Sequence, residues 1–191
     1  ATATSDSVAA SRFWAAVPSA DLQIRKIHSG LPALIVDRIT DIVISDFDGI
    51  ELETEDLQKL WDEISEDNRF PELLGESIVE TLVTGDGAFK LVVDPEVSQL
   101  PIIEFYSGER VEYRSVRGRL QEIVFLSEYT YRDKTYQLEE TYGRGYIQTQ
   151  LYDGDGKEVP LGMVPETANL VPEVTYVGGF MMAVPLRFFK S

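Results

Sequence analysis

Residues 82–93 read LVTGDGAFKLVV, and within these twelve positions the chain changes from helical to strand character. Gly85-Asp86-Gly87 supplies the left-handed stop that ends many helices. The run that follows, residues 88–93, is predicted to be a strand. Because helices come before this point and strands after it, the sequence predicts an α+β fold rather than an alternating α/β fold.

Three helices are predicted between residues 31 and 84, from apolar side chains that recur at helical spacing. The first runs from Leu31 to about Ser45, Thr54 is a plausible N-cap for the second, and Pro71 lies near the first turn of the third. A short alternating strand, residues 50–53, is predicted after Asp48-Gly49. The apolar positions are Leu31, Leu34, Ile35, Ile39, Ile42 and Val43, then Leu57, Leu60, Trp61 and Ile64, then Leu73, Leu74, Ile78, Val79 and Leu82.

Beyond residue 95 the period changes to two, which is typical of strands in an antiparallel sheet. Residues 105–152 contain 10 of the 20 aromatic side chains, with seven basic and seven acidic residues. This composition predicts an antiparallel β-meander with aromatic and charged faces. Its predicted strands are residues 101–106, 111–114, 120–125, 128–131, 136–139 and 146–152, and residues 153–156 form a hairpin turn.

A length of 191 residues fits one domain or one domain with an appendage. We expect residues 1–29 to be a flexible or helical N-terminal segment, with a short helix ended by Pro18. Residues 30–94 are expected to form an acidic helical part with the first strands, and residues 95–191 an antiparallel β-rich part. Together, residues 30–191 are expected to form one domain.

Composition excludes several kinds of chemistry. The chain has no cysteine and a single histidine, His28, so thiolate catalysis, Cys-ligated zinc and multi-His metal sites are excluded. Its apolar runs fall short of the ~20 residues that span a bilayer, so no membrane association is expected. The net charge of −16 opposes tight binding to a phosphate backbone. Between residues 41 and 86 there are 15 acidic residues against Lys59 and Arg69, a balance of −13, so most of the acidity belongs to the helical stretch.

One motif suggests an enzyme. Residues 42–49 read IVISDFDG, an apolar run that leads into Asp-x-Asp-Gly and resembles the first motif of the haloacid dehalogenase phosphatases. That resemblance implies a Mg²⁺-dependent phosphatase in which Asp46 attacks phosphorus and Asp48 acts as acid or base. Against this reading, the apolar residues before Asp46 have helical spacing, Ile50 stands where the family prefers Thr or Val, and an antiparallel meander follows instead of parallel strands.

Other motifs have simpler structural interpretations. The segment 153–158 begins like a calcium loop, but Lys157, Glu158 and Val164 occupy the positions that need Asp or Asn, Gly and Glu. Gly85-Asp86-Gly87 follows a helix and precedes a strand, which is the reverse of a phosphate-binding loop. The tyrosines of the meander leave open a β-rich module that binds a ligand by stacking. We predict no catalytic, cofactor-binding or metal-ligating residues outside the phosphatase alternative.

The order of these elements resembles a known family. Residues 70–94, which include FPELLGE, LVTGDGAFK and the aspartate at 94, are similar to the helix–glycine–strand segment of bacteriophage portal proteins. Residues 103–106, 111–113, 118–125 and 136–140 are similar to the meander that follows it in those proteins, and residues 181–191 resemble the approach to their stem. The similarity covers roughly residues 30–191.

The resemblance implies a structural protein and not an enzyme. Portal subunits form a homo-oligomeric ring, typically of about twelve copies, at one vertex of the capsid. Double-stranded DNA passes through this ring without sequence-specific contact, and the ring docks the packaging terminase, the capsid and the head–tail connector proteins. The chain is shorter than whole portals, so we expect it to correspond to the N-terminal, wing-like part. The implied location is the virion, and the host cytoplasm during assembly, with no cofactor.

Overall fold

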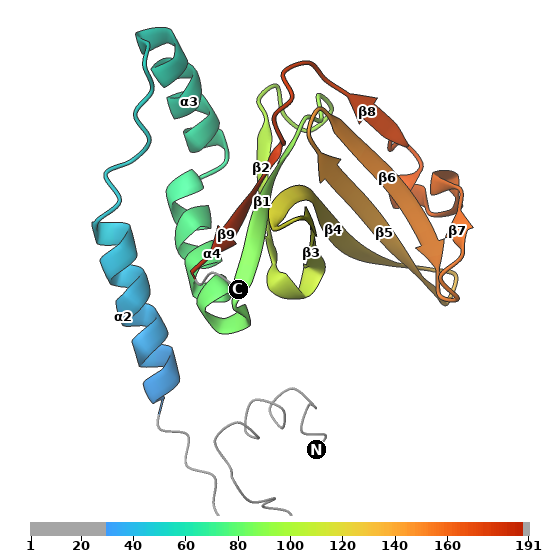
Figure 1. Cartoon of the computed structure of the whole chain (residues 1–191), viewed down its shortest axis with the longest axis horizontal. Coiled ribbons are helices and arrows are strands. Elements are labelled where there is room, and N and C mark those ends of the chain that lie inside the picture. The colour runs from blue at the N-terminus through green and yellow to red at the C-terminus, as the bar shows by residue number, and fades with distance from the viewer. Residues whose placement is uncertain (1–29, 189–191) are drawn as a thin grey trace, which may run out of the picture. The chain divides into compact units, whose positions relative to one another are not determined.

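The computed structural model describes residues 30–188, and its residues from Ile35 onward belong to one compact unit. Three helices come first in this part of the chain and nine strands follow (Figure 1). The α+β prediction is therefore confirmed. The predictions made for residues 1–29 lie outside the described residues. Across residues 30–188, every helix is too short or too polar to cross a membrane.

Helix α2 (Leu31–Ser45) has the predicted bounds, and none of its own residues is buried. The strand predicted at residues 50–53 is wrong, because the segment between α2 and the next helix is irregular. Side-chain hydrogen bonds replace the missing partner strand. The Gln58 amide oxygen accepts from the Leu52 N–H at 2.9 Å, and its amide nitrogen donates to the Ile50 carbonyl at 3.2 Å.

Helices α3 (Glu55–Asp67) and α4 (Phe70–Thr84) follow, each with the predicted N-terminal feature. The Thr54 hydroxyl caps α3 by accepting from the Leu57 N–H at 3.3 Å, and a proline opens α4. Between them, Asn68 fastens the end of α3 to the sheet. Its amide nitrogen donates to the Pro101 carbonyl at 2.9 Å and its oxygen accepts from the Ile103 N–H at 2.7 Å.

The helix-to-strand change occurs where the sequence predicts it. Gly85 caps α4 with a φ of 102°, and strand β1 (Asp86–Val92) begins at the next residue. Strand β1 is the centre of a three-stranded antiparallel sheet, between β2 (Ile102–Ser107) and β9 (Ala183–Arg187). An aromatic series joins this sheet to the helices, because Trp61, Phe70, Phe89 and Phe105 lie 5.1 to 6.4 Å apart in successive ring pairs.

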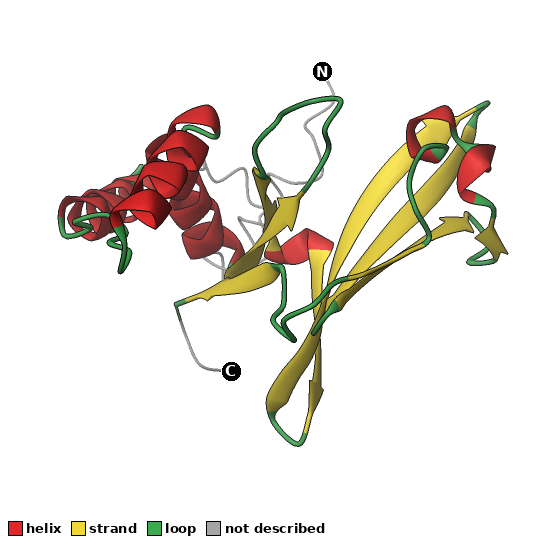
Figure 2. Ribbon diagram, turned by 90° about the horizontal axis from the view of Figure 1, so that it is seen from above, coloured by secondary structure: helices red, strands yellow, loops and turns green. Residues whose placement is uncertain are grey.

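The meander forms a second, six-stranded antiparallel sheet (Figure 2). Its main path is β3-β4-β5-β6-β7, and β8 also pairs with β6. Residues 120–125 and 128–131, predicted as separate strands, belong to one strand of 13 residues, β4. The bounds are β3 Val111–Val116, β4 Arg119–Tyr131, β5 Lys134–Gly143, β6 Tyr146–Asp153, β7 Glu158–Val159 and β8 Glu173–Thr175, with short 3₁₀ turns η1 Gly108–Arg110, η2 Leu161–Met163 and η3 Pro165–Thr167.

The two sheets share a hydrophobic core. Ala88 of β1 and Ala183 of β9 pack with residues of β3, β4 and β5, and the Phe125 and Tyr142 rings meet edge to face at 5.2 Å. Burying a large apolar side chain such as Phe125 contributes about 1.5–3 kcal/mol. A second cluster closes the other end of the larger sheet and consists of Tyr136, Leu138, Leu151 and Val164.

Candidate functional site

The two aspartates of the phosphatase-like motif lie in an exposed connection. Asp46 forms the turn that ends α2, and Asp48 lies in the irregular segment after it. A helix, not a strand, precedes Asp46. Within residues 30–188, no hydrogen bond or ion pair holds either carboxylate in a fixed position. The structure therefore does not build the strand-end nucleophile position that the phosphatase family uses.

The other two glycine-containing motifs have structural roles. Gly85 and Gly87 connect α4 to β1, as described above. In the 153–156 turn, the Asp153 carboxylate accepts from the N–H groups of Asp155, at 3.1 Å, and Lys157, at 2.9 Å. This carboxylate is thus occupied by its own hairpin. Among the described residues, no group of three or more His, Asp or Glu side chains is arranged to hold a metal ion.

The most distinctive cluster of charges surrounds Lys90, which the sequence analysis did not single out. Only 3% of this lysine is exposed, although it lies in the middle of β1. Its ammonium group forms ion pairs with Glu140 of β5 and, at 3.2 Å, with Glu104 of β2. It also lies 4.7 Å from the centre of the Tyr106 ring and 5.6 Å from that of Phe125. In the sequence, the one indication of this cluster is that Lys90 lies between apolar residues.

The electrostatics of this cluster indicate a structural role. Burial alone lowers the pKa of Lys90, but the Glu140 carboxylate, with the Glu104 carboxylate and two nearby tyrosines, raises that pKa far above its usual value. The ammonium group therefore stays charged at neutral pH and is neither a nucleophile nor a general base. Because its partners belong to both sheets, the Lys90 cluster joins β1 of the small sheet to β5 of the large one.

One open hollow, of about 560 Å³, lies on the larger sheet near the 153–156 turn. It is lined by Glu128, Glu139, Asp153 and Tyr152, together with Thr135, Gln137 and two glycines. Its lining contains three carboxylates and one amide but no positively charged side chain, so a ligand here would have to be neutral or cationic. Tyr136 and Tyr142, two of the meander tyrosines considered for stacking, are instead buried in the core.

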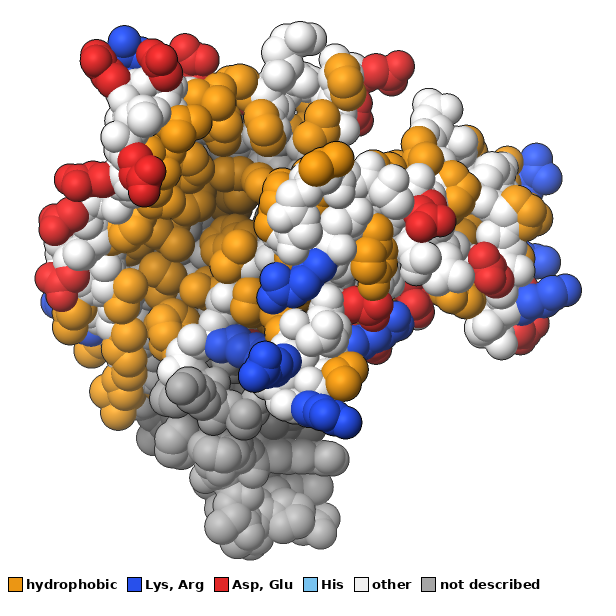
Figure 3. Space-filling model, turned by 45° about the horizontal axis from the view of Figure 1, so that its top comes forward, with side chains coloured by type: hydrophobic (Ala, Val, Ile, Leu, Met, Phe, Trp, Pro, Cys, Tyr) orange, Lys and Arg blue, Asp and Glu red, His pale blue; other side chains and the backbone are white. Residues whose placement is uncertain are grey.

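The described residues also include an exposed apolar surface on the helical side. Nine large apolar side chains between Ile35 and Leu60 are each 36–61% exposed. Figure 3 shows hydrophobic side chains gathered over the helices. We call this set the helical apolar face. Its members are Ile35, Ile39, Ile42, Val43, Phe47, Ile50, Leu52, Leu57 and Leu60. Exposed apolar surface on this scale is typical of a protein interface.

Comparison with known proteins does not assign this chain to a family. No family model matches the sequence. A search of curated proteins also found no similar sequence.

Proposed function

We propose that this chain is a structural subunit of a bacteriophage portal ring and has no enzymatic activity. In this proposal it contributes to the homo-oligomeric ring at a capsid vertex, through which double-stranded DNA is packaged and ejected. Its partners are further copies of itself, the terminase, the capsid and the head–tail connector proteins.

The observation that carries the proposal is the order of the elements. Helices α3 and α4 lead through Gly85-Asp86-Gly87 into β1, and the meander β3-β4-β5-β6 follows. This is the order that the portal resemblance implies. The individual motifs of the resemblance are loose, so its specificity comes from their order.

Two properties of the surface support a subunit of a larger assembly. The helical apolar face is exposed in the single chain and needs a partner to leave water. The acidic surface of the helical stretch repels a polyanion, which suits a protein that lets DNA slide past without binding its phosphates. We infer that the acidic helical stretch stays clear of the DNA.

The reading frames beside the gene test this proposal directly. A terminase gene upstream and a head-morphogenesis gene downstream are expected. Unrelated metabolic genes on both sides would contradict the proposal.

A phosphatase assay tests the alternative that the chain is an enzyme. Phosphatase activity on a generic aryl phosphate with Mg²⁺, present in the chain as given and lost in Asp46→Asn, would overturn the structural function. We expect no turnover above the buffer rate in either protein.

A further inference from the structure

A second apolar surface lies at one end of the larger sheet, and its charges are positive. Val116 is exposed beside the β3–β4 turn, and the loop that holds Val177 and Phe180 is bonded to the β5–β6 turn through Gly145. Val177 is 97% exposed. Gly145 donates its N–H to the Phe180 carbonyl at 3.0 Å, and its carbonyl accepts from the Tyr176 N–H at 2.9 Å.

Three arginines lie in or beside the two turns at this end of the sheet. Arg117 and Arg119 belong to the β3–β4 turn and Arg144 to the β5–β6 turn, and all three are exposed. Strands β4 and β5 are antiparallel, so both turns lie at the same end of the sheet. Within residues 30–188, none of the three has a carboxylate within 4.0 Å. We call this surface, Val116, Arg117, Arg119, Arg144, Val177 and Phe180, the basic end.

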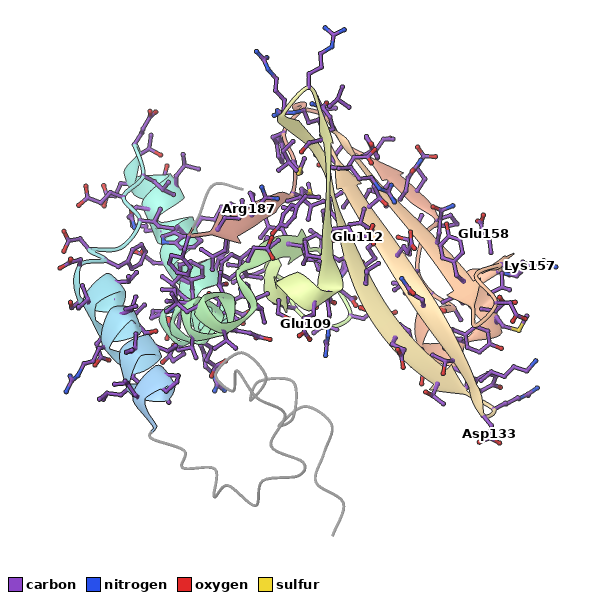
Figure 4. All side chains as sticks on the ribbon, turned by 60° about the horizontal axis from the view of Figure 1, so that its bottom comes forward. Glu109, Glu112, Asp133, Lys157, Glu158 and Arg187 are labelled. Carbon is purple, nitrogen blue, oxygen red and sulfur yellow. The ribbon has the colours of Figure 1, made fainter. Side chains whose placement is uncertain are left out.

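The opposite end of the larger sheet has charges of both signs. Asp133 marks the tip of the β4–β5 hairpin there, and Lys157 and Glu158 lie on the neighbouring β6–β7 hairpin (Figure 4). Acidic and basic side chains are mixed at those two hairpins. The unpaired arginines beside exposed apolar groups are therefore a property of the basic end and not of hairpin tips in general.

The helical apolar face has the complementary charge. Residues 46–53, between α2 and α3, alternate between exposed apolar side chains and Asp46, Asp48, Glu51 and Glu53. Within the described part of the chain, no ion pair joins any of these four carboxylates to a lysine or arginine. Each surface thus combines exposed apolar side chains with unpaired charges of one sign, and both kinds of side chain occur in protein interfaces.

We propose that the helical apolar face of one copy docks on the basic end of a second copy of this chain. The acids of residues 46–53 pair with Arg117, Arg119 and Arg144 of the neighbour, while Ile50 and Leu52 cover its Val116. Because the two surfaces are different patches of one chain, the contact is head to tail and repeats from copy to copy. The inference rests on the proposed ring function, since it names the surfaces by which the subunits meet.

Charge reversal on each surface tests the contact. The variants are Arg117→Glu/Arg119→Glu and Glu51→Lys/Glu53→Lys in the 191-residue chain, with molar mass followed by light scattering against concentration at about 0.05 M salt, where screening is weak. We expect the unaltered chain to form species larger than a monomer. Each reversal alone should weaken this association about tenfold or more.

Mixing the two variants is the decisive step. One variant keeps the acidic surface of residues 46–53 and the other keeps the basic end, so an equal mixture should associate again through this one intact pair of surfaces. The control variants are Arg132→Glu/Lys134→Glu and Asp155→Lys/Glu158→Lys, which change the charge by the same amounts at the opposite end of the sheet. Both should associate like the unaltered chain.

The outcomes separate this inference from the proposed function. An unaltered chain that stays monomeric, reversal variants that associate undiminished, or a mixture that stays apart would each overturn the docking contact. The neighbouring genes decide the portal function independently. A portal gene neighbourhood combined with charge-independent association would keep the ring and remove this interface.

Discussion

At the scale of single residues, Lys90 is the clearest case of a charge that the fold must satisfy. Replacing Lys90 with Met removes the cation and leaves the half-buried Glu104 and the more deeply buried Glu140 facing each other's charge. Breaking a buried ion pair costs about 3–5 kcal/mol, because the remaining charge has lost its solvation and its partner. We therefore expect Lys90→Met to lower the free energy of urea unfolding by that amount.

The double variant Lys90→Met/Glu140→Gln provides the control for this prediction. It removes the stranded carboxylate, so it should be more stable than Lys90→Met alone. A loss below about 1 kcal/mol for Lys90→Met would contradict the role of the Lys90 cluster as a junction between the sheets.

Two tyrosines with raised pKa values predict an alkaline limit to stability. Burial raises the pKa of Tyr142, and a hydrogen bond to the Glu122 carboxylate raises that of Tyr146 to about 12. Near pH 11 the unfolded chain binds fewer protons at these groups than the folded chain, so the free energy of unfolding falls as pH rises. The raised pKa of Lys90 acts with the same sign. We expect stability to be level from pH 7 to 9 and to decline from pH 10 to 12.

Tyr146→Phe isolates one contribution to that decline. The variant lacks the phenol, so its decline between pH 10 and 12 should be shallower than that of the unaltered chain, measured by urea unfolding at each pH. If the free energy of unfolding falls equally steeply with pH in the two proteins, Tyr146 has the same pKa in the folded and the unfolded state.

Three arginines lie at positive φ, where arginine is disfavoured, and two of them are in hairpin turns. Arg117 has a φ of 52° and Arg132 a φ of 51°, in the two-residue turns of adjacent hairpins. Asparagine tolerates this conformation better, so Arg132→Asn should raise the free energy of unfolding by about 0.5–1 kcal/mol. Lys134→Asn, at a neighbouring position without a positive φ, should not stabilise the fold. A loss of stability in Arg132→Asn would contradict the assignment of backbone strain to this turn.

At the scale of elements, replacing each of two glycines by alanine should change the stability of the fold in opposite directions. Gly75 lies inside α4 with open space where a methyl group would stand, whereas a Cβ on Gly87 of β1 would lie 2.5 Å from the Phe105 ring and 2.8 Å from the Tyr106 carbonyl oxygen. Gly75→Ala should stabilise the fold by about 0.5–1 kcal/mol, because alanine loses less backbone entropy. Gly87→Ala should destabilise it by about 1–3 kcal/mol through overpacking. Thermal unfolding of the two variants checks both signs, and a stabilising Gly87→Ala would contradict the close packing of β1 on β2.

Local signals in the sequence predicted the helices well. The spacing of apolar residues, the Thr54 cap and the glycines at 85 and 87 all act within one turn of chain, and they placed α2, α3 and α4 correctly. The strand predicted at 50–53 failed because alternation alone supplies no partner, and Gln58 bonds that backbone instead.

Distant pairings could not be predicted in the same way. Strand β9 pairs with β1, with Lys90 opposite Ala183 about half the chain away, and this pairing forms a sheet separate from the meander. The Lys90 cluster depends on the same arrangement, since Glu140 comes from the other sheet. The basic end likewise combines turns that are separate in the sequence, so no local pattern indicated it.

At the scale of the whole molecule, the helical apolar face is expected to contribute to assembly and not to the stability of the single chain. Helix α2 buries none of its own residues, so Ile35→Asp/Ile42→Asp should change the free energy of unfolding by no more than about 0.5 kcal/mol. The same substitutions place two charges in the apolar centre of the proposed contact, where desolvating them is costly. We therefore expect association to be lost while the fold is kept.

Salt concentration distinguishes the loss of association in Ile35→Asp/Ile42→Asp from the loss of association in the charge-reversal variants. At about 0.5 M salt the ionic attraction is screened, but the apolar contribution is not. Light scattering should therefore show that Ile35→Asp/Ile42→Asp stays monomeric at both low and high salt, whereas Val97→Asp, at an exposed valine outside both docking surfaces, should associate like the unaltered chain. Undiminished association of the Ile35→Asp/Ile42→Asp variant would mean that the subunits meet without this face, because a buried apolar centre cannot accept two unpaired carboxylates.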